Sequence, residues 1–175
     1  VDNDKNLNHE YPGLLMKVFR WPIIRLFNAL PARVGRKIFF AFAGKKGDTK
    51  EVAKSAASHK ALEIIYTYPE RHAQGKTGLI DDFWEMFMIN CRAARSRLKI
   101  TIRELTFFIE NVSSRKGKIN LLSLGSGSAR ALIESLKNVQ GKVGVETKLI
   151  DLSERAIKYS KKLAEEKGVS GIASY

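Results

Sequence analysis

The sequence holds one cysteine, four prolines and no long apolar run. Cys91 has no partner for a disulfide within the chain, and a lone cysteine in an apolar helical pattern indicates a reducing compartment, so we expect a cytoplasmic protein. No window reaches the roughly 18 consecutive apolar residues that a membrane-spanning helix needs. With 44% hydrophobic and 28% charged residues, the composition is that of a folded globular chain.

Basic residues outnumber acidic ones most strongly in the first two thirds of the chain. Residues 1–118 carry 22 basic and 12 acidic residues, against 9 and 6 in residues 119–175, and the whole chain has a formal net charge of +13. Such a surface attracts anions, whether nucleic-acid phosphates, anionic lipid headgroups or an acidic substrate. A solvated face that only keeps the protein soluble is the alternative.

Helical patterns fill the region before residue 116. We expect a frayed tail over 1–13 and a basic helical region over 14–115, beginning with two short helices broken near Trp21-Pro22. A helix capped by Asp48 or Thr49 should end at Pro69. A long pattern from Leu79 to Val112 predicts one helix or two. The segment 14–43 is basic and amphipathic, which suits either a cap packed on the rest of the protein or an anionic membrane surface.

Two candidate groups in this region allow a structural or a functional role. One is the stripe Phe83, Trp84, Phe87 and Met88, which we interpret as part of the hydrophobic core. The alternative is that it lines a substrate pocket. The other comprises the histidines His9, His59 and His72. They lack the cysteine or acidic spacing of a zinc site, so we predict no metal.

The pattern changes at Lys118 to alternating strands and helices. We predict a strand over 119–124 buried on both faces, a turn at Gly125–Ser128, a helix over 129–139 and a strand over 145–152 that carries Asp151 at its end. Ser153 should cap a helix that ends at Gly168, and 171–175 should begin a third strand. This order predicts an α/β fold that opens a doubly wound parallel sheet.

The turn and Asp151 form the strongest candidate site. Glycines at 125 and 127 let the backbone approach a ligand, and the helix that follows presents N–H groups and a partial positive charge. An acidic residue at the end of the next strand can accept hydrogen bonds from ribose hydroxyls. A dinucleotide fingerprint would need a small residue at position 130, where this chain has Arg130, so nicotinamide and flavin cofactors are disfavoured.

The run from Leu121 to Ala129 resembles the first motif of the class I S-adenosylmethionine-dependent methyltransferases, which reads apolar-apolar-acidic-apolar-G-x-G-x-G. Ser123 replaces the acidic residue and Ala129 replaces the last glycine. The resemblance implies a Rossmann-like fold and S-adenosylmethionine as cofactor, with Asp151 on the ribose and Leu152 beside the adenine. The implied cofactor-binding residues are Leu124, Gly125, Ser126, Gly127, Ser128, Asp151 and Leu152.

The resemblance also implies how much of the fold is present. The sheet of that family has seven strands, so 116–175 would be its opening part, truncated before the motifs that usually carry catalytic groups. We therefore expect methyl transfer to a small-molecule or lipid acceptor, with the basic region favouring an anionic one, and can name no catalytic residue. The alternatives are an NAD(P)-dependent oxidoreductase and a non-enzymatic basic module that binds RNA or anionic lipid.

Overall fold

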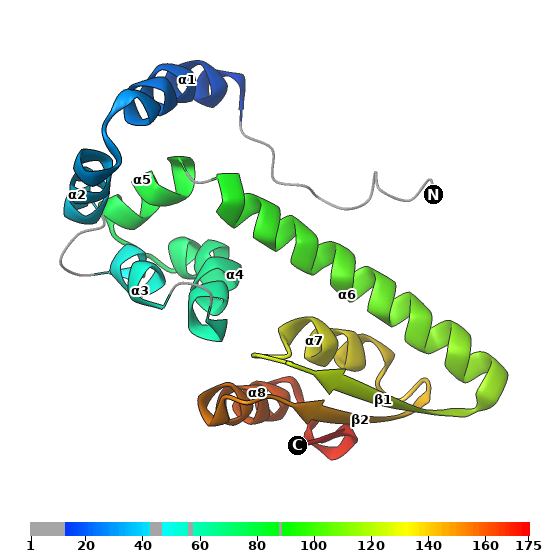
Figure 1. Cartoon of the computed structure of the whole chain (residues 1–175). Coiled ribbons are helices and arrows are strands. Elements are labelled where there is room, and N and C mark those ends of the chain that lie inside the picture. The colour runs from blue at the N-terminus through cyan, green and yellow to red at the C-terminus, as the bar shows by residue number, and fades with distance from the viewer. Residues whose placement is uncertain (1–12, 43–46, 56–57, 88) are drawn as a thin grey trace. The chain divides into compact units, whose positions relative to one another are not determined.

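The computed structural model describes residues 13–42, 47–55, 58–87 and 89–175 (Figure 1). The chain forms two compact units, Val1–Ser96 and Arg97–Tyr175. The long helix α6 (Ile89–Lys116) contributes residues to both units. The division at 115–116 that the sequence predicts remains a prediction.

The first two helices break at a different proline from the one predicted. Helix α1 (Leu14–Ala29) continues through Pro22, and the break falls before α2 (Ala32–Phe42), at Leu30-Pro31. Leu30 has an extended backbone, with ψ 142°, because the ring of a following proline disfavours the helical conformation. Pro22 lacks one N–H but leaves the rest of α1 helical, so the predicted break near Trp21-Pro22 is wrong.

The next predicted helix is two helices in the structure. Helix α3 (Asp48–Lys54) follows Gly47, and α4 (His59–Ala73) begins after Ser58, whose side chain accepts from the Ala61 N–H at 3.5 Å. Helix α4 does not end at Pro69 as predicted. The missing N–H at Pro69 would have donated to the Ile65 carbonyl, and the Arg95 guanidinium donates to that carbonyl at 3.2 Å instead.

The pattern that begins at Leu79 forms two helices, α5 (Leu79–Phe87) and α6. The buried side of α5 carries Asp81 and Glu85, whereas Ile80 and Phe83 are 48% and 44% exposed. Of the aromatic stripe that the sequence predicted to be core, Phe83 is exposed and Trp84 is half-buried, so the prediction is wrong at Phe83. The side chains of Phe87 and Met88 lie outside the described residues.

A buried carboxylate explains why this side of α5 faces inward. Asp81 accepts hydrogen bonds from the N–H and the hydroxyl of Thr49, at 2.9 and 2.8 Å, and from the Gly78 N–H at 3.2 Å. These hydrogen bonds join the starts of α3 and α5. A buried carboxylate is tolerated because it has hydrogen-bond partners, whereas an unpaired one would be costly.

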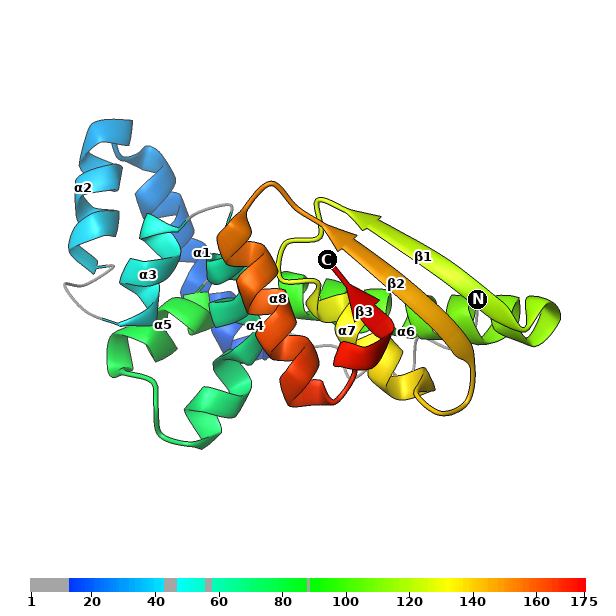
Figure 2. The same cartoon turned by 90° about the horizontal axis from the view of Figure 1, so that it is seen from below.

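The second unit contains a parallel sheet. Its described strands are β1 (Lys118–Leu124), β2 (Gly144–Ile150) and the short β3 (Ala173–Ser174), with β2 in the middle. Helix α7 (Arg130–Val139) connects β1 to β2, and α8 (Glu154–Lys167) with a 3-10 turn (Ser170–Ile172) connects β2 to β3 (Figure 2). The α/β class and the order of elements predicted for this half are confirmed.

Local capping signals place the last helix correctly. The Ser153 hydroxyl accepts from the Ala156 N–H at 3.3 Å at the start of α8, and Gly168 ends the helix with a left-handed backbone, φ 75°. Both predicted caps are confirmed.

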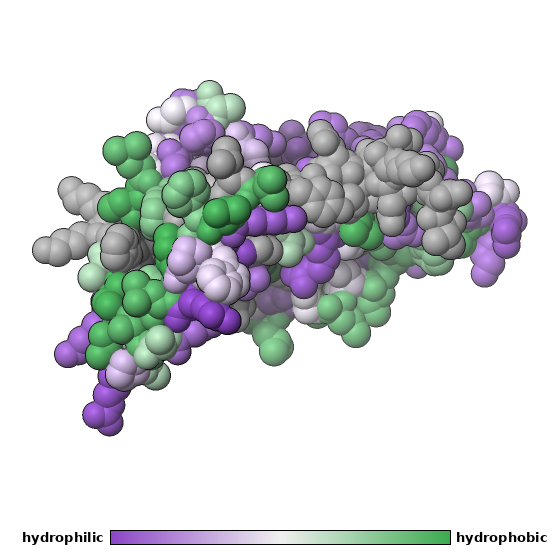
Figure 3. All heavy atoms as spheres, turned by 90° about the horizontal axis from the view of Figure 1, so that it is seen from above, coloured by the Kyte–Doolittle hydropathy of each residue, from purple (hydrophilic) through white to green (hydrophobic). Residues whose placement is uncertain are grey.

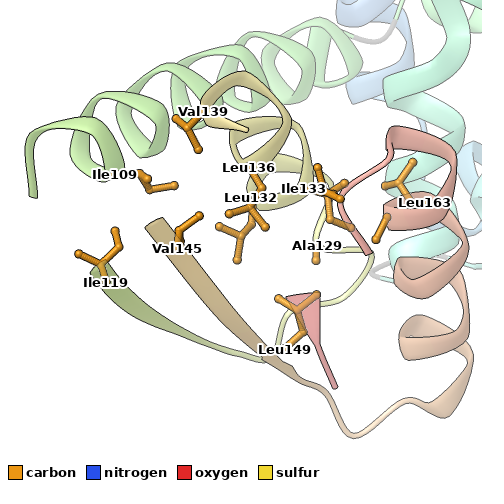
Figure 4. Close-up of a cluster of buried hydrophobic side chains, with 12 residues drawn as sticks. Ile109, Ile119, Ala129, Leu132, Ile133, Leu136, Val139, Val145, Leu149 and Leu163 are labelled. Atoms are coloured by element: carbon orange, nitrogen blue, oxygen red, sulfur yellow. The ribbon is translucent and has the colours of Figure 1, made fainter. Parts of the chain in front are cut away.

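The core of the second unit lies on one face of the sheet (Figure 4). Ile119, Val145 and Leu149 point toward α7, α8 and the second half of α6, where Ile133, Leu136 and Ile109 are fully buried. The side chains of β1 alternate, and Leu122 and Leu124 are 61% and 70% exposed. The prediction that this strand is buried on both faces is wrong for the described residues, because their helices cover a single face.

Candidate functional site

The carboxyl ends of β1 and β2 meet where the glycine turn begins. Leu124 pairs in register with Ile150, so the turn Gly125–Ser128 and Asp151 leave the sheet side by side. The Ser126 N–H donates to the Ile150 carbonyl at 3.1 Å and its hydroxyl donates to the same oxygen at 3.3 Å. Two segments 26 residues apart are therefore held together by the parallel pairing and by hydrogen bonds across the strand ends.

The turn has an alternating left-handed backbone. Gly125, Gly127 and Ala129 have φ of 62°, 56° and 51°. A side chain added to Gly125 would find no atom within 4 Å, so this part of the turn is open, and glycine is required for its backbone angle rather than for space. The turn therefore needs positive φ at every second residue, and this explains the spacing of Gly125, Gly127 and Ala129.

Ala129 occupies the third of these positions. It is the one non-glycine residue with positive φ within the described ranges, and it is 8% exposed. Ala129→Gly would relieve a backbone strain of about 1–2 kcal/mol. It would also remove a buried methyl group worth about 0.8 kcal/mol and increase the conformational entropy of the unfolded chain. We therefore expect the free energy of unfolding to change by less than about 1 kcal/mol.

Ala129→Val, by contrast, should lower the free energy of unfolding by about 2 kcal/mol or more, because a β-branched residue is poorly tolerated at φ 51°. Urea unfolding of both variants measures the difference. Equal stability of the valine and glycine variants would contradict the role given to the backbone angle.

The Asp151 carboxylate is hydrogen-bonded both to the glycine turn and to Ser153, the residue that caps α8. One carboxylate oxygen accepts from the Gly127 N–H at 2.7 Å, and the other accepts from the Ser153 N–H at 2.8 Å. A carboxylate has about four acceptor sites and a negative charge, which is the chemistry that neighbouring hydroxyl groups of a ligand require. The arrangement places a negative charge next to an open backbone turn, which is suited to a ligand with neighbouring hydroxyls.

The other predicted site residues divide into exposed and buried ones. Leu152, just after β2, is fully exposed, and Leu124, at the end of β1, is largely so, which leaves apolar side chains exposed after both strands. Ser128 is 8% exposed and sits at the entry to α7, so its side chain belongs to the interior. The N-terminus of α7 adds a partial positive charge at the same edge of the sheet.

Arg130 has a structural place in this unit. Its guanidinium contacts Glu134 and the Tyr159 hydroxyl, each at 3.4 Å, and so links α7 to α8. Its side chain is 11% exposed. A dinucleotide fold needs a small residue here for close helix packing, and the space is filled by a long charged side chain.

A separate hollow opens elsewhere on this unit. Its volume is about 470 Å³, and it is bordered by strand residues and by the segment that leads into β3, including Asn120, Lys148 and Gly171. None of its lining residues belongs to the predicted cofactor site. The hollow therefore supplies no argument for that site.

The first unit holds a polar cluster that sequence reasoning did not single out. Asp82 accepts from the hydroxyls of Thr77 and Tyr68, at 2.7 and 2.9 Å, and lies 3.1 Å from the His72 ring. The hydrogen bond from Thr77, followed by those from Tyr68 and His72 and the His72 charge, lowers the pKa of Asp82. Its carboxylate stays ionised at neutral pH, which suits an anchoring acceptor better than a general base.

Cys91 is buried beside the ion pair of Glu85 and Arg95. Burial, and then the charge of Glu85, raise the pKa of its thiol to about 11. The thiol is protonated at neutral pH and is a poor nucleophile, so it offers no catalytic group. Of the other candidates, His9 lies outside the described residues, and the described part of the chain holds no group of three or more potential metal ligands.

Comparison with known families gives the class of this protein. The model of the family Methyltransf_20, described as "Putative methyltransferase", matches residues 43–175. The match covers more than half of the chain, so the chain belongs to this family and is an enzyme, a methyltransferase. A search of curated proteins gave no match. Within the described residues no helix is long and apolar enough to cross a membrane.

Proposed function

We propose that this methyltransferase takes its methyl group from S-adenosylmethionine, bound at the glycine turn and Asp151. The observation that carries the proposal is the 2.7 Å hydrogen bond from the Gly127 N–H to the Asp151 carboxylate, which joins the two motifs at one edge of the sheet. We take the sheet, with β2 between β1 and β3, as the opening of a Rossmann-like fold.

The residues present fit such a cofactor. Open backbone at Gly125 leaves room for a polar chain, the Asp151 carboxylate is an acceptor for ribose hydroxyls, and exposed Leu152 offers an apolar surface to an adenine ring. The partial positive charge at the start of α7 favours the carboxylate of a methionine moiety. Ser123, on the strand before the turn, supplies no charge there.

Bound in this way, S-adenosylmethionine supplies an electrophilic methyl group on a sulfonium. The residues of this chain would position the cofactor. The turn would present its backbone to it, Asp151 would orient its ribose, and the sheet would hold the turn and Asp151 in place. The acceptor we propose is a small molecule or a lipid, and an anionic one agrees with the basic residues 1–118.

Calorimetric titration of the purified protein with S-adenosylhomocysteine tests the proposal. We expect saturable binding to one site and no binding of NAD(H) or NADP(H), because Arg130 fills the place of the small residue in a dinucleotide fold. Tight dinucleotide binding without binding of S-adenosylhomocysteine would overturn the proposal in favour of an oxidoreductase-type site.

A further inference from the structure

The two N-terminal helices precede the region matched by the methyltransferase family. We call Leu14–Phe42, which comprises α1 and α2, the basic helical segment. Between Glu10 and Asp48 the sequence has 8 basic residues and no acidic one, and so contains more than half of the net charge of +13. This concentration needs an explanation other than the cofactor site.

The segment also exposes large apolar side chains. On α1, Phe19, Leu26 and Phe27 share one side of the helix, since they are spaced by seven and eight residues. Phe19 and Leu26 are 66% and 64% exposed, and Phe27 is 37% exposed. No side chain of the segment that the structure describes is buried. Figure 3 shows hydrophobic (green) side chains gathered over the α1 and α2 end, with hydrophilic (purple) ones beside them.

A tryptophan and an arginine lie on the other side of α1, since at about 100° per residue Trp21 is roughly 140–160° around the helix from Phe19 and Leu26. Trp21 is 61% exposed, and the Arg25 guanidinium lies 4.3 Å from the centre of its ring. Arg25 therefore belongs to the basic side of α1, and an arginine can keep its charge in the headgroup region while its stem covers apolar surface.

Helix α2 separates charge from apolar surface in the same way. Arg33, Arg36 and Lys37 are spaced three and four residues apart and therefore share a side, and all three are exposed. Val34 lies on another side of the helix and is 42% exposed. Both helices thus combine a basic side with an apolar one.

We propose that the basic helical segment binds the surface of an anionic membrane, with the helices lying in the interface. A bilayer accounts for both features together: acyl chains take up the apolar side and anionic headgroups attract the arginines and lysines. A nucleic acid would account for the charge but would leave Phe19 and Leu26 in water. The proposal does not depend on the cofactor site.

Cosedimentation of the full chain with lipid vesicles tests this. We expect binding to vesicles of phosphatidylcholine mixed with phosphatidylserine, weak binding to phosphatidylcholine alone, and loss of binding as salt is raised. The variant Arg33→Glu/Arg36→Glu/Lys37→Glu should partition at least about 100-fold less, since each basic residue near an anionic surface contributes roughly fivefold.

Two further variants separate charge from apolar contact. Lys76→Glu/Lys137→Glu/Lys158→Glu makes the same change in net charge at exposed lysines outside the segment and should bind like the parent protein. Phe19→Ser/Leu26→Ser keeps every charge and should bind at least about tenfold less, because it removes apolar area that enters the bilayer. Circular dichroism verifies that each variant is folded.

Tryptophan fluorescence locates the contact. In the variant Phe19→Trp/Trp21→Phe, the emission of the tryptophan placed at position 19 should shift to shorter wavelength on addition of anionic vesicles, because position 19 lies on the apolar side of α1. A shift of equal size in Trp21→Phe alone would arise from Trp84 and would overturn the proposal. Equal loss of binding in both charge variants, or binding to homopolymer RNA with none to anionic vesicles, would overturn it as well.

Discussion

Replacing Arg95 by alanine is expected to lower the free energy of unfolding by about 3–5 kcal/mol, because it leaves a carboxylate buried without its counter-ion. Arg95 and Glu85 are 4% and 7% exposed, and the guanidinium of Arg95 donates to the Glu85 carboxylate. The same guanidinium donates to the Ile65 carbonyl at 3.2 Å, the group that Pro69 leaves without a backbone donor. It also lies 5.7 Å from the centre of the Tyr68 ring. One side chain therefore contacts a carboxylate, a carbonyl and an aromatic ring.

Urea unfolding followed by tryptophan fluorescence measures this effect, since Trp21 and Trp84, the two tryptophans of the chain, lie in the first unit. Lys60→Ala is the matched control. It removes the cation of an exposed ion pair with Glu51, and we expect no measurable change. The double variant Glu85→Leu/Arg95→Met should regain part of the lost stability, because two apolar side chains need no counter-ion but leave the Ile65 carbonyl without the donor that Arg95 supplies. If Arg95→Ala lowers the free energy of unfolding by less than about 1 kcal/mol, the Glu85 carboxylate is not left as an unpaired buried charge in that variant, and the prediction is wrong.

The second large effect concerns Asp151. Asp151→Ala should weaken binding of S-adenosylhomocysteine by about 1–3 kcal/mol, which is roughly 5- to 150-fold in Kd, from the loss of charge-assisted hydrogen bonds. The structure adds a second cause to the one that the sequence predicts: the same substitution releases the Gly127 N–H from the carboxylate and loosens the turn. Asp151→Asn keeps one acceptor oxygen and should give an intermediate loss.

The control for Asp151 lies on the strand that precedes it. Glu146→Ala removes an exposed carboxylate on β2, paired with Lys118 at 2.6 Å and bordering the separate hollow rather than the turn. Calorimetry should find its affinity unchanged. Unchanged affinity in Asp151→Ala would remove the ribose assignment, and equal losses in both variants would point to a general effect on the sheet.

Predictions from sequence succeeded where the signal is local. Ser153 and Gly168 place the ends of α8, because a hydroxyl that caps an N–H and a residue that adopts positive φ act within a few residues of themselves. The order of strands and helices after residue 116 follows from the period of the apolar residues in the same way. The site residues 124–128, 151 and 152 remain predictions, although the hydrogen bond between Gly127 and Asp151 agrees with their grouping.

Prolines and buried charges were beyond the reach of such local rules. Pro22 and Pro69 lie within helices, whereas Pro31 follows a break, and the sequence offers no clear distinction between them. At Pro69 the deciding group is Arg95, 26 residues further along the chain. Asp81 and Glu85 occupy the buried side of α5 for the same reason: their partners Thr49 and Arg95 come from other helices.

The sequence by itself determined that the turn has positive φ angles and that an acidic residue follows the next strand. It also determined that the second unit has an α/β fold. Those features depend on positive φ, on strand period and on caps, which neighbouring residues control. Only the tertiary structure decided which side of each helix is buried, which face of the sheet is covered and which N–H Asp151 holds. These depend on partners distant in the sequence, and an isolated segment cannot specify the group that will satisfy a carbonyl or neutralise a charge.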